Sequence, residues 1–144
     1  MSDPQAIAST HATYPRSGAE WMALVVSLAL FLLGVRAFFD PVSASAAFGL
    51  PMHSGAETSF VQVYGARNAF LGAVALSLIL LRMTKPVALI FTLATVLPPL
   101  DAWVIVSRLG MSGELIRHAI ILLVLVVASV LLWRQQREAG EWSN

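Results

Sequence analysis

The chain has 144 residues, of which 58% are hydrophobic and only 12% are charged. Ordinary soluble domains carry about 25% charged residues, and the long apolar runs of this chain place it among integral membrane proteins. The net charge of +1 gives no basic excess for binding nucleic acid. The absence of cysteine excludes disulfides, thiolate catalysis and zinc–thiolate sites.

Four stretches approach the about 20 apolar residues that a helix needs to cross a hydrocarbon core. They are residues 21–39, 60–81, 87–107 and 114–133. Because every backbone polar group must be satisfied inside lipid, helices are expected and not strands. The sequence therefore predicts an all-α, four-transmembrane-helix bundle over residues 21–134. A flexible N-terminal tail over residues 1–20 and a C-terminal tail over residues 135–144 complete the chain.

Prolines mark where the apolar stretches stop or break. Pro41 ends the first stretch, because proline cannot continue a helix. Pro98 and Pro99 interrupt the third stretch and leave carbonyls without partners, some of which the Thr95 hydroxyl is expected to bond. Broken helices are tolerated in lipid where they face protein or a wet cavity. A pocket is therefore expected beside Asp101.

The segment between the first two stretches, residues 41–59, is too long and too apolar for a bare hairpin. Residues 43–48 are predicted to form a short extramembrane helix that Gly49 and the following residues end. Two roles stay open for this helix. It acts as a lid over the mouth of the bundle, or it is an interfacial segment that shields helix ends.

Basic residues in the short loops indicate the orientation, because they are enriched on the cytoplasmic side. One side of the predicted bundle carries Arg16, Arg82, Lys85, Arg134 and Arg137. The opposite side has residues 41–59, which contain no lysine or arginine, and a short turn flanked by Arg108 and Arg117. The sequence thus predicts a multi-pass protein with both termini in the cytoplasm.

Ionisable residues inside the bilayer cost roughly 2.5–3.5 kcal/mol each on insertion scales, so by default they mark a site with partners. Five such residues lie one to two turns from the same end of their stretches: Arg36, Arg67, Asp101, Glu114 and His118. Four helices would bring them to one level of the bilayer. At that level Arg67 and Arg36 are the expected partners of Asp101.

Helical spacing groups further residues. Tyr64, Arg67 and Asn68 share one face at i, i+3 and i+4, beside a stripe of small residues suited to close helix contact: Gly65, Ala69 and Gly72. Glu114 and His118 stand at i and i+4, and a carboxylate with an imidazole permits acid–base catalysis near neutral pH. With one intramembrane histidine and two carboxylates, no metal or other cofactor is expected.

Several of these residues also have simpler interpretations. Glu114 at a helix start favours the positive end of the helix dipole. Arg36 and Arg67 are also consistent with purely structural ion pairs. Trp103 is a candidate substrate-binding residue, although tryptophans near span ends are typical interface anchors.

A run of motifs resembles a family of small four-helix membrane proteins of largely uncharacterised function. The run is Arg36, Asp40-Pro41, Phe48-Gly49, Gly65-Ala-Arg67-Asn68-x-x-x-Gly72 and Pro98-Pro-Leu-Asp101, and the resemblance covers about residues 30–120. Fungal relatives belong to polyketide pathways, where they resemble epoxide-opening hydrolases or cyclases. The resemblance implies functional roles for Arg36, Arg67, Asn68 and Asp101, and less securely for His118. Asn68 stands where many relatives carry an acidic residue.

Opening an epoxide needs a base for water and an acid for the leaving oxygen, and soluble limonene-epoxide-hydrolase-type enzymes use similar groups. The leading hypothesis is therefore a membrane-embedded enzyme opening an epoxide of a lipophilic small molecule, by hydrolysis or related ring opening. Asp101 would be the base, His118 or Glu114 the acid, and Arg67 the charge holder. Substrate-binding roles fall to Arg36, Tyr64, Asn68 and Trp103.

Two other classes of function use the same residues. A non-enzymatic carrier of a lipophilic molecule such as a quinone requires only a cavity and an exit. A structural membrane subunit requires only ion pairs that fix helix packing. A homo-oligomer is compatible with each of the three.

Overall fold

The computed structural model describes residues 17–53, 55–138 and 140. In this part of the chain there are six helices and no strand: α1 Gly18–Phe39, α2 Pro41–Phe48, α3 Ala56–Leu80, α4 Thr84–Ala94, α5 Leu97–Leu109 and α6 Glu114–Glu138. Helices α4 and α5 together form one span, Thr84–Leu109, so four segments are long and apolar enough to cross a membrane. The predicted four-helix membrane bundle is confirmed, and the protein is a multi-pass membrane protein.

Each of the four spans extends beyond its predicted range at one end or both. Helix α1 begins at Gly18 because Ser17 caps it, accepting a hydrogen bond from the Glu20 main-chain N–H at 3.1 Å. Helix α6 continues to Glu138, past the end of the apolar run. Residues 1–16 and 141–144 of the predicted tails lie outside the described part of the chain.

The third span breaks at residues 95–96, just before the two prolines. Pro98 and Pro99 have no N–H, so the helix cannot continue its i→i−4 bonds there. The Thr95 main-chain N–H instead donates to the Thr92 carbonyl at 3.3 Å, a tighter i→i−3 bond. The Thr95 hydroxyl donates to the same Thr92 carbonyl at 2.7 Å, and not to the Ala94 or Thr95 carbonyl that the missing N–H groups of the prolines leave without a donor, so the predicted bond is not the one formed.

Helices α1 and α3 pack with their backbones in direct contact, through the predicted small-residue stripe. A Cβ atom on Gly34 would lie 2.2 Å from the Ala69 main-chain nitrogen. One on Gly65 would lie 2.6 Å from the Phe38 main-chain nitrogen. Since no side chain fits between the helices at these points, α1 and α3 form one rigid pair.

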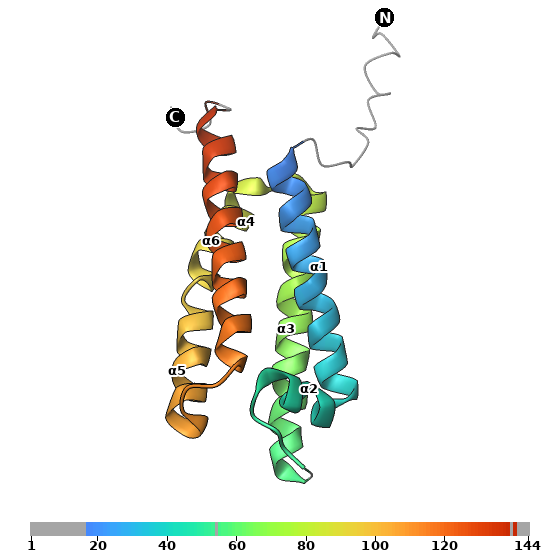
Figure 1. The fold of residues 1–144 in the computed structure, drawn as a ribbon. Coiled ribbons are helices and arrows are strands. Elements are labelled where there is room, and N and C mark those ends of the chain that lie inside the picture. The colour runs from blue at the N-terminus through green and yellow to red at the C-terminus, as the bar shows by residue number, and fades with distance from the viewer. Residues whose placement is uncertain (1–16, 54, 139, 141–144) are drawn as a thin grey trace, which may run out of the picture.

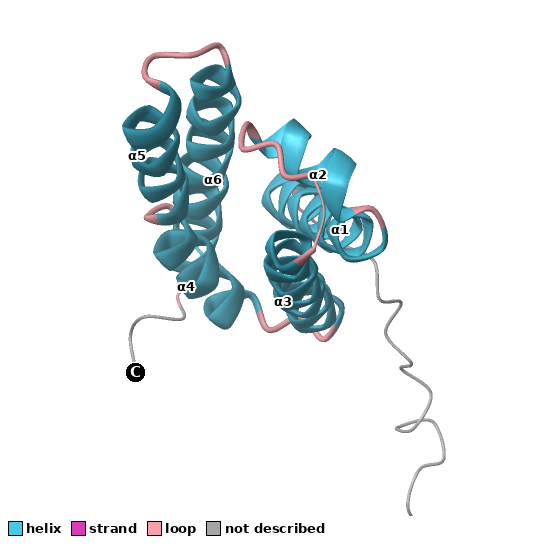
Figure 2. Ribbon diagram, turned by 90° about the horizontal axis from the view of Figure 1, so that it is seen from below, coloured by secondary structure: helices cyan, strands magenta, loops and turns pink. Residues whose placement is uncertain are grey.

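The helices form two groups, α1–α3 on one side and α4–α6 on the other (Figures 1 and 2). Helix α3 contacts α1, α2 and, less extensively, α4, and makes at most marginal contact with α5 or α6. We call the end with the start of α1 and the last turns of α6 the terminal end. The opposite end, where α2 lies in Figure 1, is the α2 end.

The terminal end holds the main hydrophobic core: Ala19, Ala23, Ile79, Val87, Ala88, Phe91, Ala128 and Leu132. Side-chain hydrogen bonds also join the two groups there. The Ser17 hydroxyl donates to Gln135 Oε1 at 2.7 Å, and Gln135 Nε2 donates to Glu20 Oε1 at 2.8 Å. The hydrophobic core and these two bonds hold the two groups together at this end. Within the second group, Gln136 Nε2 of α6 donates to the Thr84 hydroxyl of α4.

The predicted short helix is confirmed as α2, which starts at Pro41 in the first-turn position that suits proline. Asp40 caps it, because its Oδ1 accepts the Ser43 main-chain N–H at 3.2 Å. Hydrogen bonds from Ser43, helped by the nearby charge of Arg36, lower the pKa of the Asp40 carboxyl below its ordinary value. Gly49 ends α2 in the left-handed conformation, with φ of 103°.

Candidate functional site

Polar and aromatic side chains from four helices gather at the α2 end. We call them the α2-end cluster: Phe48, Tyr64, Asn68, Asp101, Glu114, Arg117 and His118. They come from α2, α3, α5 and α6. The common bilayer level that the sequence predicted therefore corresponds to a real gathering for most of these residues.

Asp101 and His118 form the centre of the α2-end cluster. Asp101, half-buried in the first turns of α5, interacts electrostatically with His118 on α6 and with Tyr64 on α3. His118 is buried, with 5% of its surface exposed. Its Nδ1 lies 3.1 Å from the Glu114 main-chain oxygen, which can only accept a hydrogen bond. The ring therefore carries a proton on Nδ1, and Nε2 is the nitrogen left for chemistry.

Tyr64 and Asn68 present their polar groups on one face of α3, as predicted, and the Asn68 side chain is near enough to influence the Tyr64 phenol. The Phe48 ring of α2 lies edge-on to both neighbours. Its centroid is 5.2 Å from that of His118 and 6.2 Å from that of Tyr64. Phe48 thus occupies the space between the imidazole on α6 and the phenol on α3.

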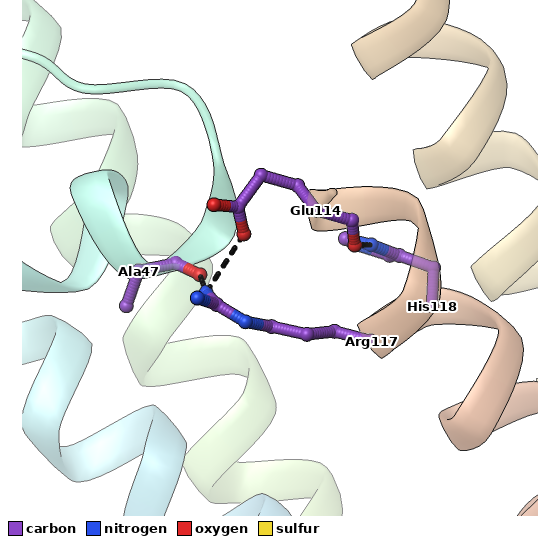
Figure 3. A network of polar contacts seen from close by, with 4 residues as sticks. All are labelled: Ala47, Glu114, Arg117 and His118. Atoms are coloured by element: carbon purple, nitrogen blue, oxygen red, sulfur yellow. Dashed lines mark hydrogen bonds and ion pairs between the residues drawn. The ribbon is translucent and has the colours of Figure 1, made fainter. Parts of the chain in front are cut away.

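Glu114 and Arg117 connect α6 to α2 (Figure 3). Arg117 Nη1 lies 2.8 Å from Glu114 Oε2, and the same nitrogen donates to the Ala47 main-chain oxygen. The Glu114 side chain packs against Gly49, where an added Cβ would lie 3.0 Å from Glu114 Cγ. These contacts commit the Glu114 carboxylate to Arg117, which leaves His118 as the better placed acid. Sequence reasoning missed Arg117, although its i, i+3 spacing from Glu114 was visible.

The arginines expected to pair with Asp101 do not do so. Among the described residues, neither the Arg36 nor the Arg67 side chain has a hydrogen bond, or an ion pair within 4.0 Å. Arg36 lies two residues after Gly34, roughly 200° around α1 from the α3 contact, and interacts with Asp40. Arg67 is exposed on α3, roughly 60° around the helix from Tyr64. Residues at the same depth in the bilayer therefore do not all direct their side chains toward Asp101.

Trp103 lies on the outer surface of α5. It is 70% exposed, and its position two residues after Asp101 places it roughly 200° around the helix. This is the location of a side chain that faces the bilayer. Its expected contact with a substrate at Asp101 would require the helix to rotate.

A hollow of about 800 Å³ lies far from the α2-end cluster. It is lined by Val130, Trp133, Arg134 and Arg137 near the end of α6, and it includes none of the predicted site residues. We assign the candidate site from the polar contacts and not from this open surface. Asp101 and His118 are potential metal ligands, but in the described ranges no third histidine, aspartate or glutamate lies so that the three could hold a metal ion.

Comparison with known proteins gives a family and no activity. Neither a curated protein nor a solved structure matches the chain. Residues 27–132, from within α1 to the last turns of α6, match the family described as "Domain of unknown function (DUF4267)". The expected kinship to an uncharacterised family of small membrane proteins is thus confirmed. The match includes residues of all four spans and the whole α2-end cluster, and the chain belongs to this DUF4267 family.

Proposed function

We propose that the protein is a membrane-embedded enzyme that opens an epoxide on a lipophilic small molecule at the α2-end cluster. One observation carries the proposal. A carboxylate on α5 and an imidazole on α6 interact inside a membrane span, and the imidazole has one nitrogen uncommitted. Water-driven ring opening needs such a base and acid around one substrate.

In this reaction Asp101 and His118 each carry out one proton transfer. Asp101 removes a proton from water while the water oxygen attacks an epoxide carbon and the carbon–oxygen bond breaks. The alkoxide takes a proton from Nε2 of protonated His118, and the product is a diol. Proton exchange with water then restores both residues. Groups poised in a low-dielectric site act more strongly than they would in water.

The remaining candidates on α3 suit supporting roles. Tyr64, within electrostatic range of Asp101, and Asn68 would orient the attacking water. Arg67 stands on the neighbouring flank of α3 without an ion pair among the described residues, so its charge is available to a developing alkoxide. The marginal contact of α3 with α5 and α6 would let a substrate dissolved in the bilayer approach from the side.

We also infer that both termini face the cytoplasm, since Arg82, Lys85, Arg134 and Arg137 all belong to the terminal end. The chain has no native cysteine, so single cysteines can report the orientation. A cysteine replacing Arg137 should be protected from an impermeant maleimide in intact cells. A cysteine replacing Met111, in the turn between α5 and α6, should be labelled. The opposite pattern reverses the orientation and leaves the site assignment unchanged.

The function is tested by incubating the purified protein in nanodiscs with a panel of lipophilic epoxides in ¹⁸O-labelled water. Diol carrying one solvent oxygen is the expected product. Product without the label would replace hydrolysis by isomerisation or cyclisation at the same residues. No product from any epoxide, together with stoichiometric binding of a quinone, would overturn the enzyme in favour of a carrier.

A further inference from the structure

Helix α2 and its C-terminal cap contact α6 through consecutive residues. Arg117 donates to the main-chain oxygen of Ala47, Glu114 packs on Gly49, and the ring between these two positions, Phe48, lies against His118. Three consecutive residues of α2 and its cap thus meet three residues in the first turns of α6, and Figure 3 shows the contact at Ala47.

We propose that Phe48 is the size-selecting wall of the site and that Arg117 is a positioning residue that holds this wall in place. The wall's role towards a substrate rests on the proposed function. Its position against His118 rests on the contacts alone. Neither residue was identified as a site residue from the sequence.

Arg117 can hold Phe48 because it fixes the backbone one residue before it. Its guanidinium has several donors in a fixed plane, so one side chain serves the Glu114 carboxylate and the Ala47 carbonyl together. The ion pair with Glu114 restricts the arginine before it reaches α2. A lysine would supply charge without this planar geometry, so it should hold α2 only in part.

Helix α2 transmits the restraint because it is internally braced. Its first turn is capped by Asp40. The buried Ser45 hydroxyl donates to the Val42 carbonyl at 2.7 Å and accepts the Met52 main-chain N–H at 3.0 Å. Loss of the Arg117 contact should therefore release the C-terminal turn of α2 as a unit, and move Phe48 away from His118.

Phe48 is expected to limit the size of the substrate that the site accepts. Phe48→Ala removes a ring next to the proposed acid while leaving Asp101 and His118 intact. It should shift the ratio of kcat/KM for bulky over small epoxides by about tenfold, the scale of a few methylenes in an apolar pocket. The change should appear mainly in KM for the bulky substrates.

The position of the wall can be tested without any substrate, by the rate at which diethyl pyrocarbonate modifies His118 in the full-length protein in nanodiscs. Wild-type His118 should react slowly because it is 5% exposed, while exposed His53 serves as an internal standard. Arg117→Gln and Phe48→Ala should each raise the His118 rate about tenfold relative to His53, the scale of one charge-assisted hydrogen bond.

Two further variants sharpen the result. Arg108→Gln removes an exposed arginine from the end of α5 and should leave the His118 rate unchanged. Arg117→Lys should give a rate between those of wild type and Arg117→Gln. If Arg117→Gln or Phe48→Ala left the His118 rate at the wild-type value, the wall and its restraint would be refuted.

The two proposals fail separately. If His118 is modified faster in the variants but no epoxide is turned over, the proposed enzymatic function is refuted and the position of Phe48 against His118 is supported. If epoxides are turned over and Phe48→Ala does not change the size preference, the enzymatic function is supported and the role of Phe48 in size selection is refuted.

Discussion

The two ends of the bundle join the same two helix groups by different means. At the terminal end, apolar packing of Ala23 and Ile79 with Leu132 and its neighbours is combined with the side-chain hydrogen bonds of Gln135 to the start of α1. At the α2 end, the recorded connection is one hydrogen bond to the Ala47 carbonyl, with ring edges and a glutamate side chain beside it.

Because of this difference, we expect the terminal end to provide stability and the α2 end to provide the chemistry. Inside lipid there is no hydrophobic force between helices, so packing and hydrogen bonds decide which contacts last. The terminal end has both and should resist unfolding. The α2 end places Asp101 and His118 together with few fixed partners, and a site that must admit a substrate belongs in such a region.

The largest effect is expected from Asp101→Asn, which keeps the shape of the side chain and removes the base. Turnover should fall by at least about 10²-fold, the usual size of a general-base contribution, while the thermal midpoint changes little. Steady-state kinetics with the best epoxide and a thermal melt measure both. Glu57→Gln, at an exposed acid of α3, is the matched control and should be neutral.

The contrary outcome has a definite form. If Asp101→Asn unfolds the protein and Arg67→Met restores it, Asp101 is a structural counter-ion and the chemistry must lie elsewhere.

At the terminal end, Gln135→Ala should lower stability and spare chemistry. It removes two hydrogen bonds, one from the Ser17 hydroxyl and one to Glu20 Oε1. A hydrogen bond contributes about 0.5–1.5 kcal/mol, so the unfolding free energy in a detergent titration should fall by about 1–3 kcal/mol. The kcat of the folded fraction should stay the same.

Gln62→Ala is the control for Gln135→Ala, because Gln62 makes a 3.3 Å contact with Phe38 within the α1–α3 pair and none recorded with the other group. If both variants destabilised the protein equally, the hydrogen bonds of Gln135 between the two helix groups would have no special role in stability.

Local chemistry along the chain made much of the fold predictable. Apolar length gave the four spans, and the missing N–H groups of Pro98 and Pro99 gave the break before Asp101. Gly49 ended the short helix because it alone adopts the left-handed cap without strain. Tyr64, Asn68, Asp101 and His118 were found from depth and spacing.

The rest depended on directions and on long-range contacts. Depth along a helix does not fix the angle around it, so Arg36 and Arg67 were wrongly expected to pair with Asp101. The contact of Ser17 with Gln135 joins opposite ends of the chain and leaves no local pattern. Arg117 was passed over because its acceptor on α2 is a main-chain carbonyl, which any residue could supply.

Gly49→Ala should loosen the α2 end by a smaller amount. Its φ of 103° is left-handed, which costs an alanine roughly 1–2 kcal/mol, and the new methyl group would press on Glu114. The His118 modification rate should rise, with little change in the global melt. Gly55→Ala is also strained, at φ of 76° and ψ of −145°, and has nothing within 4 Å. A similar rise for Gly55→Ala would mean that loop strain, and not the Glu114 contact, controls the docking.

The smallest expected effect is a dependence of α2 on acidity through Asp40, which lies outside the spans. Bonds from Ser43 lower the pKa of this carboxyl from its ordinary value of 3.8, so the folded state favours the charged form. Its contribution to α2 stability is therefore complete above pH 3.8 and is lost as the pH falls below that value. Asparagine also caps helices but does not titrate, so Asp40→Asn should retain α2 at neutral pH and lose this acid response. The mobility of a nitroxide at Val42→Cys, recorded from pH 6 down to 3, measures the response. Glu114 is present in both proteins, so the difference between the two curves isolates Asp40. Coincident curves would show that the Asp40 cap does not hold α2.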